Sequence, residues 1–207
     1  MVRFLGIEVN GCYFHFGQNI WRKLQAEGKT ADYITDLTFA AKVKKLMALA
    51  FVPETDVVLV FENIVNDIEF RPLDFLLDYF EDTYIGRQRR GRRTQPRYPV
   101  STWTQYDRVM QSLPRTNNAV EGWHNAFNNS VSIAHPTPAR LARKLQQEEH
   151  AVAVRRVQNG AGLPAPKKRK IYERVDCALD TMVRRYDVAN WSTYLADIAR
   201  LININVC

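Results

Sequence analysis

The chain of 207 residues is 46% hydrophobic and 11% aromatic, which is enough for one domain, or a small pair of domains, with an apolar core. It has no apolar run of about 18 residues, so we expect no membrane-spanning helix and no membrane partner. Its short, charged N-terminus is unlike a secretory signal peptide. The three cysteines, Cys12, Cys177 and Cys207, are widely spaced, which predicts no disulfide framework and favours a reducing compartment.

The net charge of +7 is concentrated in two short segments. Six arginines and no acid lie between positions 87 and 97, and four consecutive basic residues end at position 170. These ten positive charges exceed the net charge, so the rest of the chain is net negative. Localised positive charge attracts polyanions by releasing their counterions. The residues are Arg87, Arg89, Arg90, Arg92, Arg93 and Arg97, and then Lys167, Lys168, Arg169 and Lys170.

Hydrophobic periodicity predicts a mainly α fold. We expect one strand, from Val2 to Val9, on the family resemblance described below. Gly28 is expected to end the first helix, and Asp36 to cap a new one. The run Val57–Phe61 also fits a short strand, but the preceding Pro53 favours a helix. The predicted helices are Phe16–Glu27, Asp32–Phe51 with a break near Asp36, Pro53–Val65, Pro72–Thr83, Thr102–Met110, a helix containing Glu121, Pro138–Val157, Tyr172–Tyr186 and Ser192–Ile202. Loops are predicted at Gly86–Pro99 and Asn159–Pro166.

The segment Leu113-Pro-Arg-Thr-Asn-Asn-Ala-Val-Glu-Gly-Trp-His124 opens the helix that contains Glu121. Thr116 or Asn117 is suited to cap its first turn. The polar residues Asn117, Glu121, His124 and Asn128 share one helical face, and the apolar residues Val120, Trp123, Phe127 and Val131 form a neighbouring stripe that is predicted to be buried. Two interpretations follow. The helix either presents a metal-binding carboxylate to a cleft or is a surface helix with a solvated Glu121.

A second motif lies near the N-terminus, in Gly11-Cys-Tyr-Phe-His-Phe-Gly-Gln-Asn-Ile-Trp-Arg-Lys23. Its Cys12 and His15 are potential zinc ligands, but a structural zinc site needs four ligands, and no second Cys/His pair has suitable spacing. We therefore expect Cys12 and His15 to serve in packing and hydrogen bonding.

The order of these motifs resembles the Mutator-like element (MULE) transposases over roughly residues 7 to 150. The matching segments are the Cys-x-x-His motif, Ala48-Leu-Ala-Phe-Val-Pro53, Asp78-Tyr-Phe-Glu-Asp-Thr-Tyr-Ile-Gly86, Arg115-Thr-Asn-Asn-x-x-Glu-x-Trp-His124, Ala134-His-Pro136 and Lys144-Leu-Gln-Gln-Glu148. The resemblance implies an RNase H-like domain with a helical insertion. In that family, two Asp and one Glu hold two Mg²⁺ or Mn²⁺ ions for DNA strand cleavage and transfer. Glu121 matches the third acid and metal ligand, and Cys12, His15, Asn117, Asn118 and His124 would surround it.

The chain departs from the family pattern at both aspartates, which lie upstream of the Cys-x-x-His motif. Only eleven residues precede Cys12, and Glu8 is the sole acid among them. One Glu cannot hold two metal ions. The sequence therefore predicts the C-terminal half of a transposase domain, inactive and without a cofactor by itself: residues 1–157 as the partial domain, 158–170 as a basic linker and 171–207 as a C-terminal helical pair. Its origin is open between a truncated gene or gene model, a reused DNA- or protein-binding module, and a remnant that does not fold.

The two basic segments suggest partners. Arginine makes bidentate contacts to phosphate, so the loop containing Arg87 to Arg97 predicts nonspecific DNA binding, with a solvated, disordered loop as the alternative. Pro166-Lys-Lys-Arg-Lys170 resembles a nuclear localisation signal, which predicts importin binding and a nuclear location, with a basic helix start as the alternative. The oligomeric state is left open.

Overall fold

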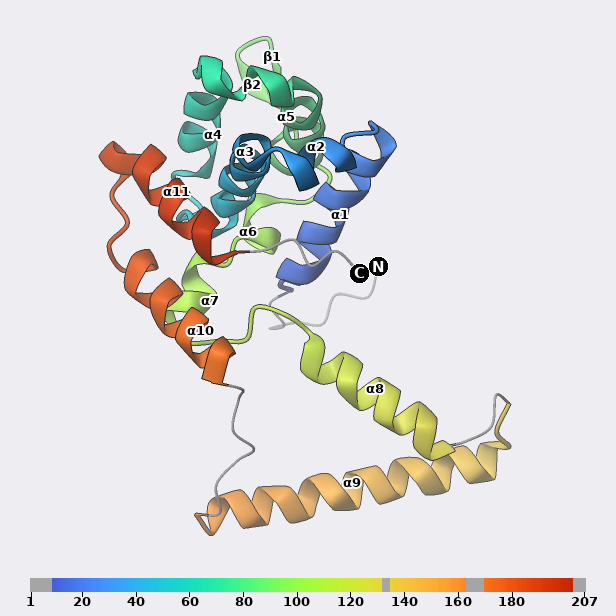
Figure 1. The fold of residues 1–207 in the computed structure, drawn as a ribbon. Helices are drawn as coiled ribbons and strands as arrows, with labels where there is room; N and C mark the ends of the chain where they lie inside the picture. The colour runs from blue at the N-terminus through green and yellow to red at the C-terminus, as the bar shows by residue number, and fades with distance from the viewer. Residues whose placement is uncertain (1–8, 132–134, 163–169, 203–207) are drawn as a thin grey trace. The chain divides into compact units, whose positions relative to one another are not determined.

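The computed structural model describes residues 9–131, 135–162 and 170–202. These residues are mainly helical and include a single two-stranded sheet, so the mainly α class is confirmed (Figure 1). Of the predicted strand Val2–Val9, only Val9 is among them, and it lies in no helix or strand. No described helix has the length and apolar composition needed to cross a bilayer.

Two compact units make up the chain. The first contains the residues up to Thr116 and those from Arg174 onward, and the second contains Asn117–Glu173. Within the first unit, the C-terminal helix Trp191–Leu201 packs against the helix Leu37–Ala48.

The first unit is built from short helices and one hairpin. Its α-helices are α1 (Tyr13–Ala26), α2 (Thr30–Thr35), α3 (Leu37–Ala48), α4 (Val57–Asn66), α5 (Asp74–Phe80), α6 (Val100–Trp103), α7 (Tyr106–Met110) and α11 (Trp191–Leu201). Its tighter or wider turns are the 3-10 segments η1 (Leu49–Phe51), η2 (Ile68–Leu73) and η4 (Val188–Asn190) and the π-helical segment η3 (Glu81–Ile85). Helix α10 (Lys170–Val183) contains the boundary between the units.

Two predicted helix ends are confirmed by their backbone geometry. Gly28 follows α1 with a φ of 67°, a conformation that glycine adopts without the steric cost of a Cβ. Asp36 separates α2 from α3, and its Oδ1 accepts hydrogen bonds from the amides of Thr38 at 2.8 Å and Phe39 at 3.1 Å. A carboxylate in this position satisfies amides that have no partner inside the helix.

The predicted helix over Val57–Phe61 is confirmed as α4, but it begins at Val57 rather than at Pro53, whose carbonyl accepts from the Val57 amide at 3.2 Å in the preceding turn. Two other predicted helices are corrected. The predicted helix Pro72–Thr83 is three successive segments, η2, α5 and η3, because Pro72 lies inside a 3-10 turn. The predicted helix Thr102–Met110 is broken at Gln105, whose amide donates to the Ala50 carbonyl of another segment.

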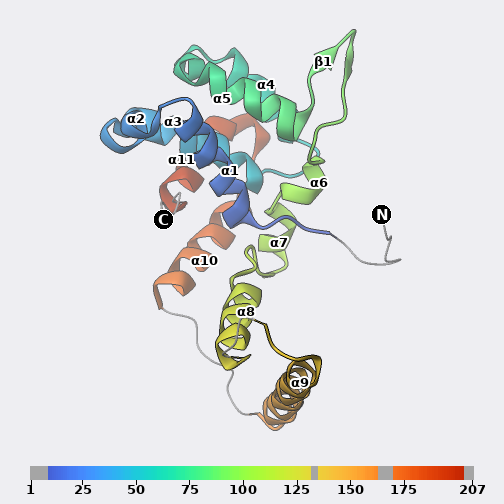
Figure 2. The ribbon, with the colours of Figure 1, turned by 90° about the vertical axis from the view of Figure 1, so that its right-hand side faces the viewer.

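An aromatic cluster forms much of the core of the first unit. Phe16, Phe80, Tyr84 and Trp103 are buried, with ring centroids 5.0 to 6.0 Å apart. Such aromatic pairs contribute to stability beyond the area that they bury. Segments α1, α5, η3 and α6 supply these rings, so the cluster fixes η3, the segment that the hairpin follows in the chain. Figure 2 shows the hairpin extending beyond α4 and α5.

The second unit contains α8 (Asn118–Val131) and α9 (Pro138–Gly160), which contact each other. Helix α9 begins at Pro138, a residue suited to the first position of a helix, and the Thr137 side chain caps it by accepting a hydrogen bond from the Arg140 amide. The predicted burial of the α8 apolar stripe is wrong for two of its four residues, and a third, Phe127, is half-buried. Val120 is 52% exposed and Trp123 is 39% exposed, whereas Val131 is buried. One neighbouring helix covers only one side of α8 within this unit, so the remaining apolar side chains stay accessible.

Candidate nucleic-acid interface

The arginine-rich segment forms a β-hairpin, which corrects the predicted loop at Gly86–Pro99. Strand β1 (Gln88–Arg89) pairs antiparallel with β2 (Arg92–Arg93), and Arg90 and Gly91 form the tip with φ values of 50° and 77°. Positive φ at both central residues is the mark of the type I′ turn, whose twist matches that of the two strands. The Thr94 amide donates to the Arg87 carbonyl at 2.8 Å and extends the pairing.

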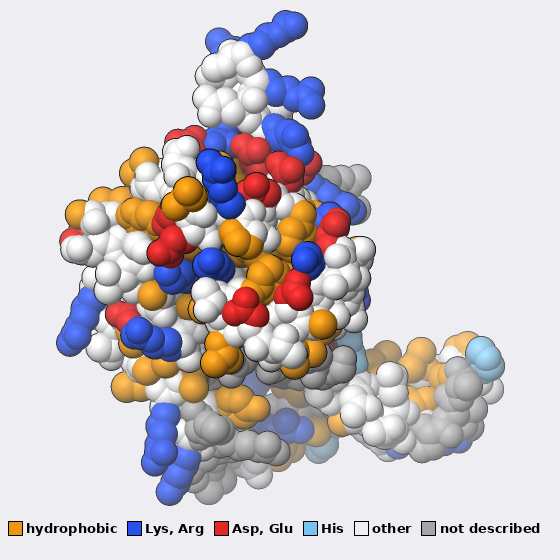
Figure 3. Space-filling view, turned by 45° about the horizontal axis from the view of Figure 1, so that its top comes forward, with side chains coloured by type: hydrophobic (Ala, Val, Ile, Leu, Met, Phe, Trp, Pro, Cys, Tyr) orange, Lys and Arg blue, Asp and Glu red, His pale blue; other side chains and the backbone are white. Residues whose placement is uncertain are grey.

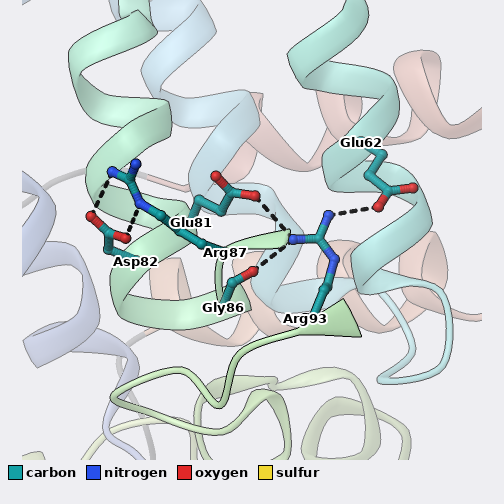
Figure 4. A network of polar contacts seen from close by, with 6 residues as sticks. All are labelled: Glu62, Glu81, Asp82, Gly86, Arg87 and Arg93. Carbon is teal, nitrogen blue, oxygen red and sulfur yellow. Dashed lines mark hydrogen bonds and ion pairs between the residues drawn. The ribbon is translucent and has the colours of Figure 1, made fainter. Parts of the chain in front are cut away.

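Arg87 is held at the base of the hairpin by Asp82. The guanidinium donates hydrogen bonds to both carboxylate oxygens, with 2.8 Å between Nη2 and Oδ2 (Figure 4). These hydrogen bonds lower the pKa of Asp82 from its ordinary value and raise the pKa of Arg87. Both groups therefore stay charged at neutral pH, and a bidentate pair of this kind occupies the arginine donors that a phosphate would use.

Arg93 is the second anchor of the hairpin. Its Nη1 donates to Glu81 Oε1 at 3.0 Å and to the Gly86 carbonyl at 2.7 Å, and its Nη2 donates to Glu62 Oε1 at 2.6 Å (Figure 4). The side chain is only 19% exposed. These contacts join β2 to α4 and to η3, so the hairpin is fixed to the helices. Arg93 thus serves the structure rather than an external anion.

The other four arginines are exposed and lie outside the ion pairs just described, although the charge of Arg89 also helps to lower the pKa of Asp82. Arg89, Arg90, Arg92 and Arg97 make no ion pair within the described ranges. Arg89 lies directly opposite Arg92 in the ladder, and neighbouring residues of a strand point to opposite faces. Since Arg93 points to Glu62 and Glu81, Arg89 and Arg92 point away from these acids. Like charges in directly opposed positions destabilise a hairpin unless an anion screens them.

Positive charge therefore gathers on the projecting hairpin, where Lys and Arg side chains dominate the outer surface (Figure 3). At its base, the Arg97 guanidinium lies over the ring of Tyr98, with 5.6 Å between Cζ and the ring centroid. The sequence identified all six arginines but did not separate the two anchors from the four exposed ones. Arg87 and Arg93 differ from the other four because they bind Glu62, Glu81 and Asp82. All three acids precede the arginine segment in the sequence, so its composition does not reveal these pairs.

Glu121 lies in the second unit, on α8, and its side chain is exposed. Asn117 immediately precedes the helix, and its carbonyl accepts from the amides of Val120 at 2.8 Å and Glu121 at 3.0 Å, as a residue at the start of a helix does. Asn118 and His124 are exposed on the same helix. The His124 ring lies 5.1 Å from that of Trp123, whose Nε1 donates to Glu148 Oε2 of α9 at 3.0 Å.

The residues around Glu121 do not form a donor set for two divalent metal ions. Within the described part of the chain, no three side chains of His, Cys, Asp or Glu come together in a way that would hold a metal. Magnesium needs several converging oxygen ligands at short range.

Cys12 and His15 lie in the first unit, at the start of α1. Cys12 is half-buried in the N-cap position, and His15 is exposed. The turn before them is fixed by neighbouring backbone. The Gly11 amide donates to the Thr102 carbonyl at 2.5 Å, and the Tyr13 amide donates to the Arg115 carbonyl at 2.9 Å. A Cβ at position 11 would lie 2.7 Å from the Thr102 carbonyl oxygen, which is too close, so only glycine fits at this position without a shift of the backbone. The Cys-x-x-His segment thus contacts Arg115 through the backbone.

Lys167, Lys168 and Arg169 of the basic segment lie outside the described residues, and Lys170 is the exposed first residue of α10. Of the two basic segments, the hairpin is therefore the one that lies wholly within the described residues. No family model matches the chain, and neither a curated protein nor a solved structure matches it.

Proposed function

We propose that the chain is a DNA-associated protein that binds the phosphate backbone independently of sequence through the arginine hairpin, defined as residues 87–97. The observation that carries this proposal is the separation of its arginines into two classes. Arg87 and Arg93 are neutralised by acids of the helical body, whereas Arg89, Arg90, Arg92 and Arg97 are exposed without ion pairs. Exposed guanidinium groups on a hairpin that is fixed to the helices are suited to binding phosphate, because each arginine can donate two parallel hydrogen bonds to one phosphate group.

The origin that fits this proposal is a MULE-like transposase from which the chain retains a DNA-associated part without catalysis. The resemblance of the sequence motifs supports this origin, and the segment Lys167–Lys170 supports nuclear import through an importin. Glu121 would then match the family's third acid without the two aspartates that complete a two-metal site.

A salt titration tests the proposal. We expect the affinity of the purified chain for duplex DNA to fall with salt, with a slope of log K against log salt concentration of about −3 to −4, since each phosphate contact contributes about −0.9. Unrelated duplexes of equal length should bind equally well. The measurement is fluorescence anisotropy over a series of KCl concentrations. A slope near zero, or a strong preference for one duplex, would contradict backbone binding by the hairpin.

A further inference from the structure

An exposed tyrosine lies at the base of the arginine hairpin. Tyr98 is 40% exposed, and its amide donates to the Thr83 carbonyl at 2.9 Å, which fixes the backbone beside η3. Its ring is stacked on the ring of Tyr84, with 5.8 Å between centroids and 27° between planes. One side of the Tyr98 ring is therefore supported by protein, while the residue keeps a large accessible surface.

The supporting ring is itself rigid. Tyr84 is 2% exposed and contacts Phe16, Phe80 and Trp103 in the aromatic cluster. Its hydroxyl accepts from Asn19 Nδ2 at 3.2 Å, and its carbonyl accepts from Trp103 Nε1 at 3.2 Å. Burial raises the pKa of Tyr84, so the hydroxyl stays neutral at physiological pH. The packed Tyr84 ring restricts the orientation of Tyr98, and a side chain that binds a ligand needs such support from its neighbours.

Tyr98 and the exposed arginines belong to one continuous surface strip. The bonds Thr94 N to Arg87 O and Tyr98 N to Thr83 O show that residues 94–98 run back beside residues 83–87. Tyr98 follows Arg92 by six positions, which is at most about 20 Å of extended chain. Arg97 lies next to the ring and makes no ion pair in the described part of the chain, so its guanidinium can turn to a phosphate and leave the ring to another planar group.

We propose that Tyr98 stacks against an unpaired DNA base while the exposed arginines contact phosphates of the same strand. Aromatic rings combined with a basic path are the two elements by which proteins bind single-stranded nucleic acid without sequence preference. In a duplex the base faces are stacked on each other, so Tyr98 has no face to bind. The arginine hairpin therefore prefers single-stranded or locally unpaired DNA to duplex DNA. This inference rests on the proposed DNA binding and specifies its substrate.

Substitution of Tyr98 separates stacking from charge. Tyr98→Leu should lower the affinity for a single-stranded oligonucleotide about tenfold, because a stacked base contributes about 1–3 kcal/mol. It should leave the affinity for duplex DNA of the same length within about twofold, because the arginines remain. Tyr98→Phe should retain single-strand binding, since the ring is kept. The probes are an oligothymidylate and a mixed duplex, each about 20 nucleotides long, which at about 3.4 Å per nucleotide is longer than the strip and so lets it be fully occupied.

Two controls complete the test. Tyr172→Leu removes another exposed tyrosine, which lies on α10, and should leave both affinities unchanged. Unaltered duplex binding by Tyr98→Leu shows that the hairpin is intact. Equal loss of both affinities, or of neither, would overturn the stacking role while leaving phosphate binding in place. A wild-type chain that binds neither probe would overturn the proposed function and this inference together.

Discussion

Replacing Arg89, Arg90 and Arg92 with alanine is expected to lower the affinity for duplex DNA about a hundredfold at low salt. Each exposed arginine is taken to contribute about 1 kcal/mol through a charge-assisted contact to phosphate, and three such contacts correspond to a factor of this size. The anchors Arg87 and Arg93 remain in this variant, so the hairpin should stay folded. Fluorescence anisotropy with a labelled duplex measures the loss.

A charge-matched variant distinguishes the hairpin from net charge. Arg22, Arg71 and Arg185 are exposed, make no ion pair in the described part of the chain, and lie on α1, on η2 and after α10. Replacing these three with alanine removes the same charge and should change the affinity by less than about threefold, since distant charges are screened at moderate salt. If both triple variants lose affinity equally, the arginine hairpin is not the contact surface.

Substitution of Gly86 by alanine is expected to lower the free energy of unfolding by at least about 2 kcal/mol. Gly86 has a φ of 87°, and a Cβ there would lie 1.9 Å from the Thr94 carbonyl oxygen, so the backbone must move. Backbone strain and overpacking each cost about 1–3 kcal/mol. The Gly86 carbonyl also accepts from Arg93, so the movement should disturb the anchor. Urea unfolding followed by near-ultraviolet circular dichroism measures the change.

Gly91→Ala is the matched control for Gly86→Ala. Gly91 also has a positive φ, of 77°, but a Cβ at this position would meet no atom within 4 Å. Its substitution should therefore cost only the conformational strain of about 1–2 kcal/mol. Equal destabilisation by both substitutions would show that the close approach to Thr94 does not matter for stability.

Much of the helical architecture could be predicted from local signals. Gly28 and Asp36 mark real helix ends because their effects depend on neighbouring backbone alone. The hairpin could not be predicted from alternation, since one face of its strands carries Gln88 and Arg93, the other carries Arg89 and Arg92, and neither face is apolar. The dipeptide Arg90–Gly91 was the remaining signal for a turn, because glycine tolerates positive φ. The break at Gln105 depends on Ala50, far away in the sequence, and so had no local signal.

The candidate site was predicted only in part. Charge clustering identified the six arginines, because composition along the chain shows it directly. The roles of Arg87 and Arg93 depend on Asp82, Glu81 and Glu62, which tertiary packing brings to them. The predicted burial beside Glu121 was wrong for Val120 and Trp123, since helical periodicity shows that a face is apolar but not what covers it.

Arg87 and Arg93 hold the hairpin through their carboxylate partners, and we propose that the exposed arginines bind DNA. Magnetic resonance of the arginine side chains tests it most directly, through the Nε–Hε signals of the labelled chain titrated with DNA. We predict large shifts for Arg89, Arg90, Arg92 and Arg97, and little change for Arg87 and Arg93, whose donors stay on carboxylates. Unchanged signals from the exposed arginines upon DNA binding, with shifts elsewhere on the chain, would contradict the account.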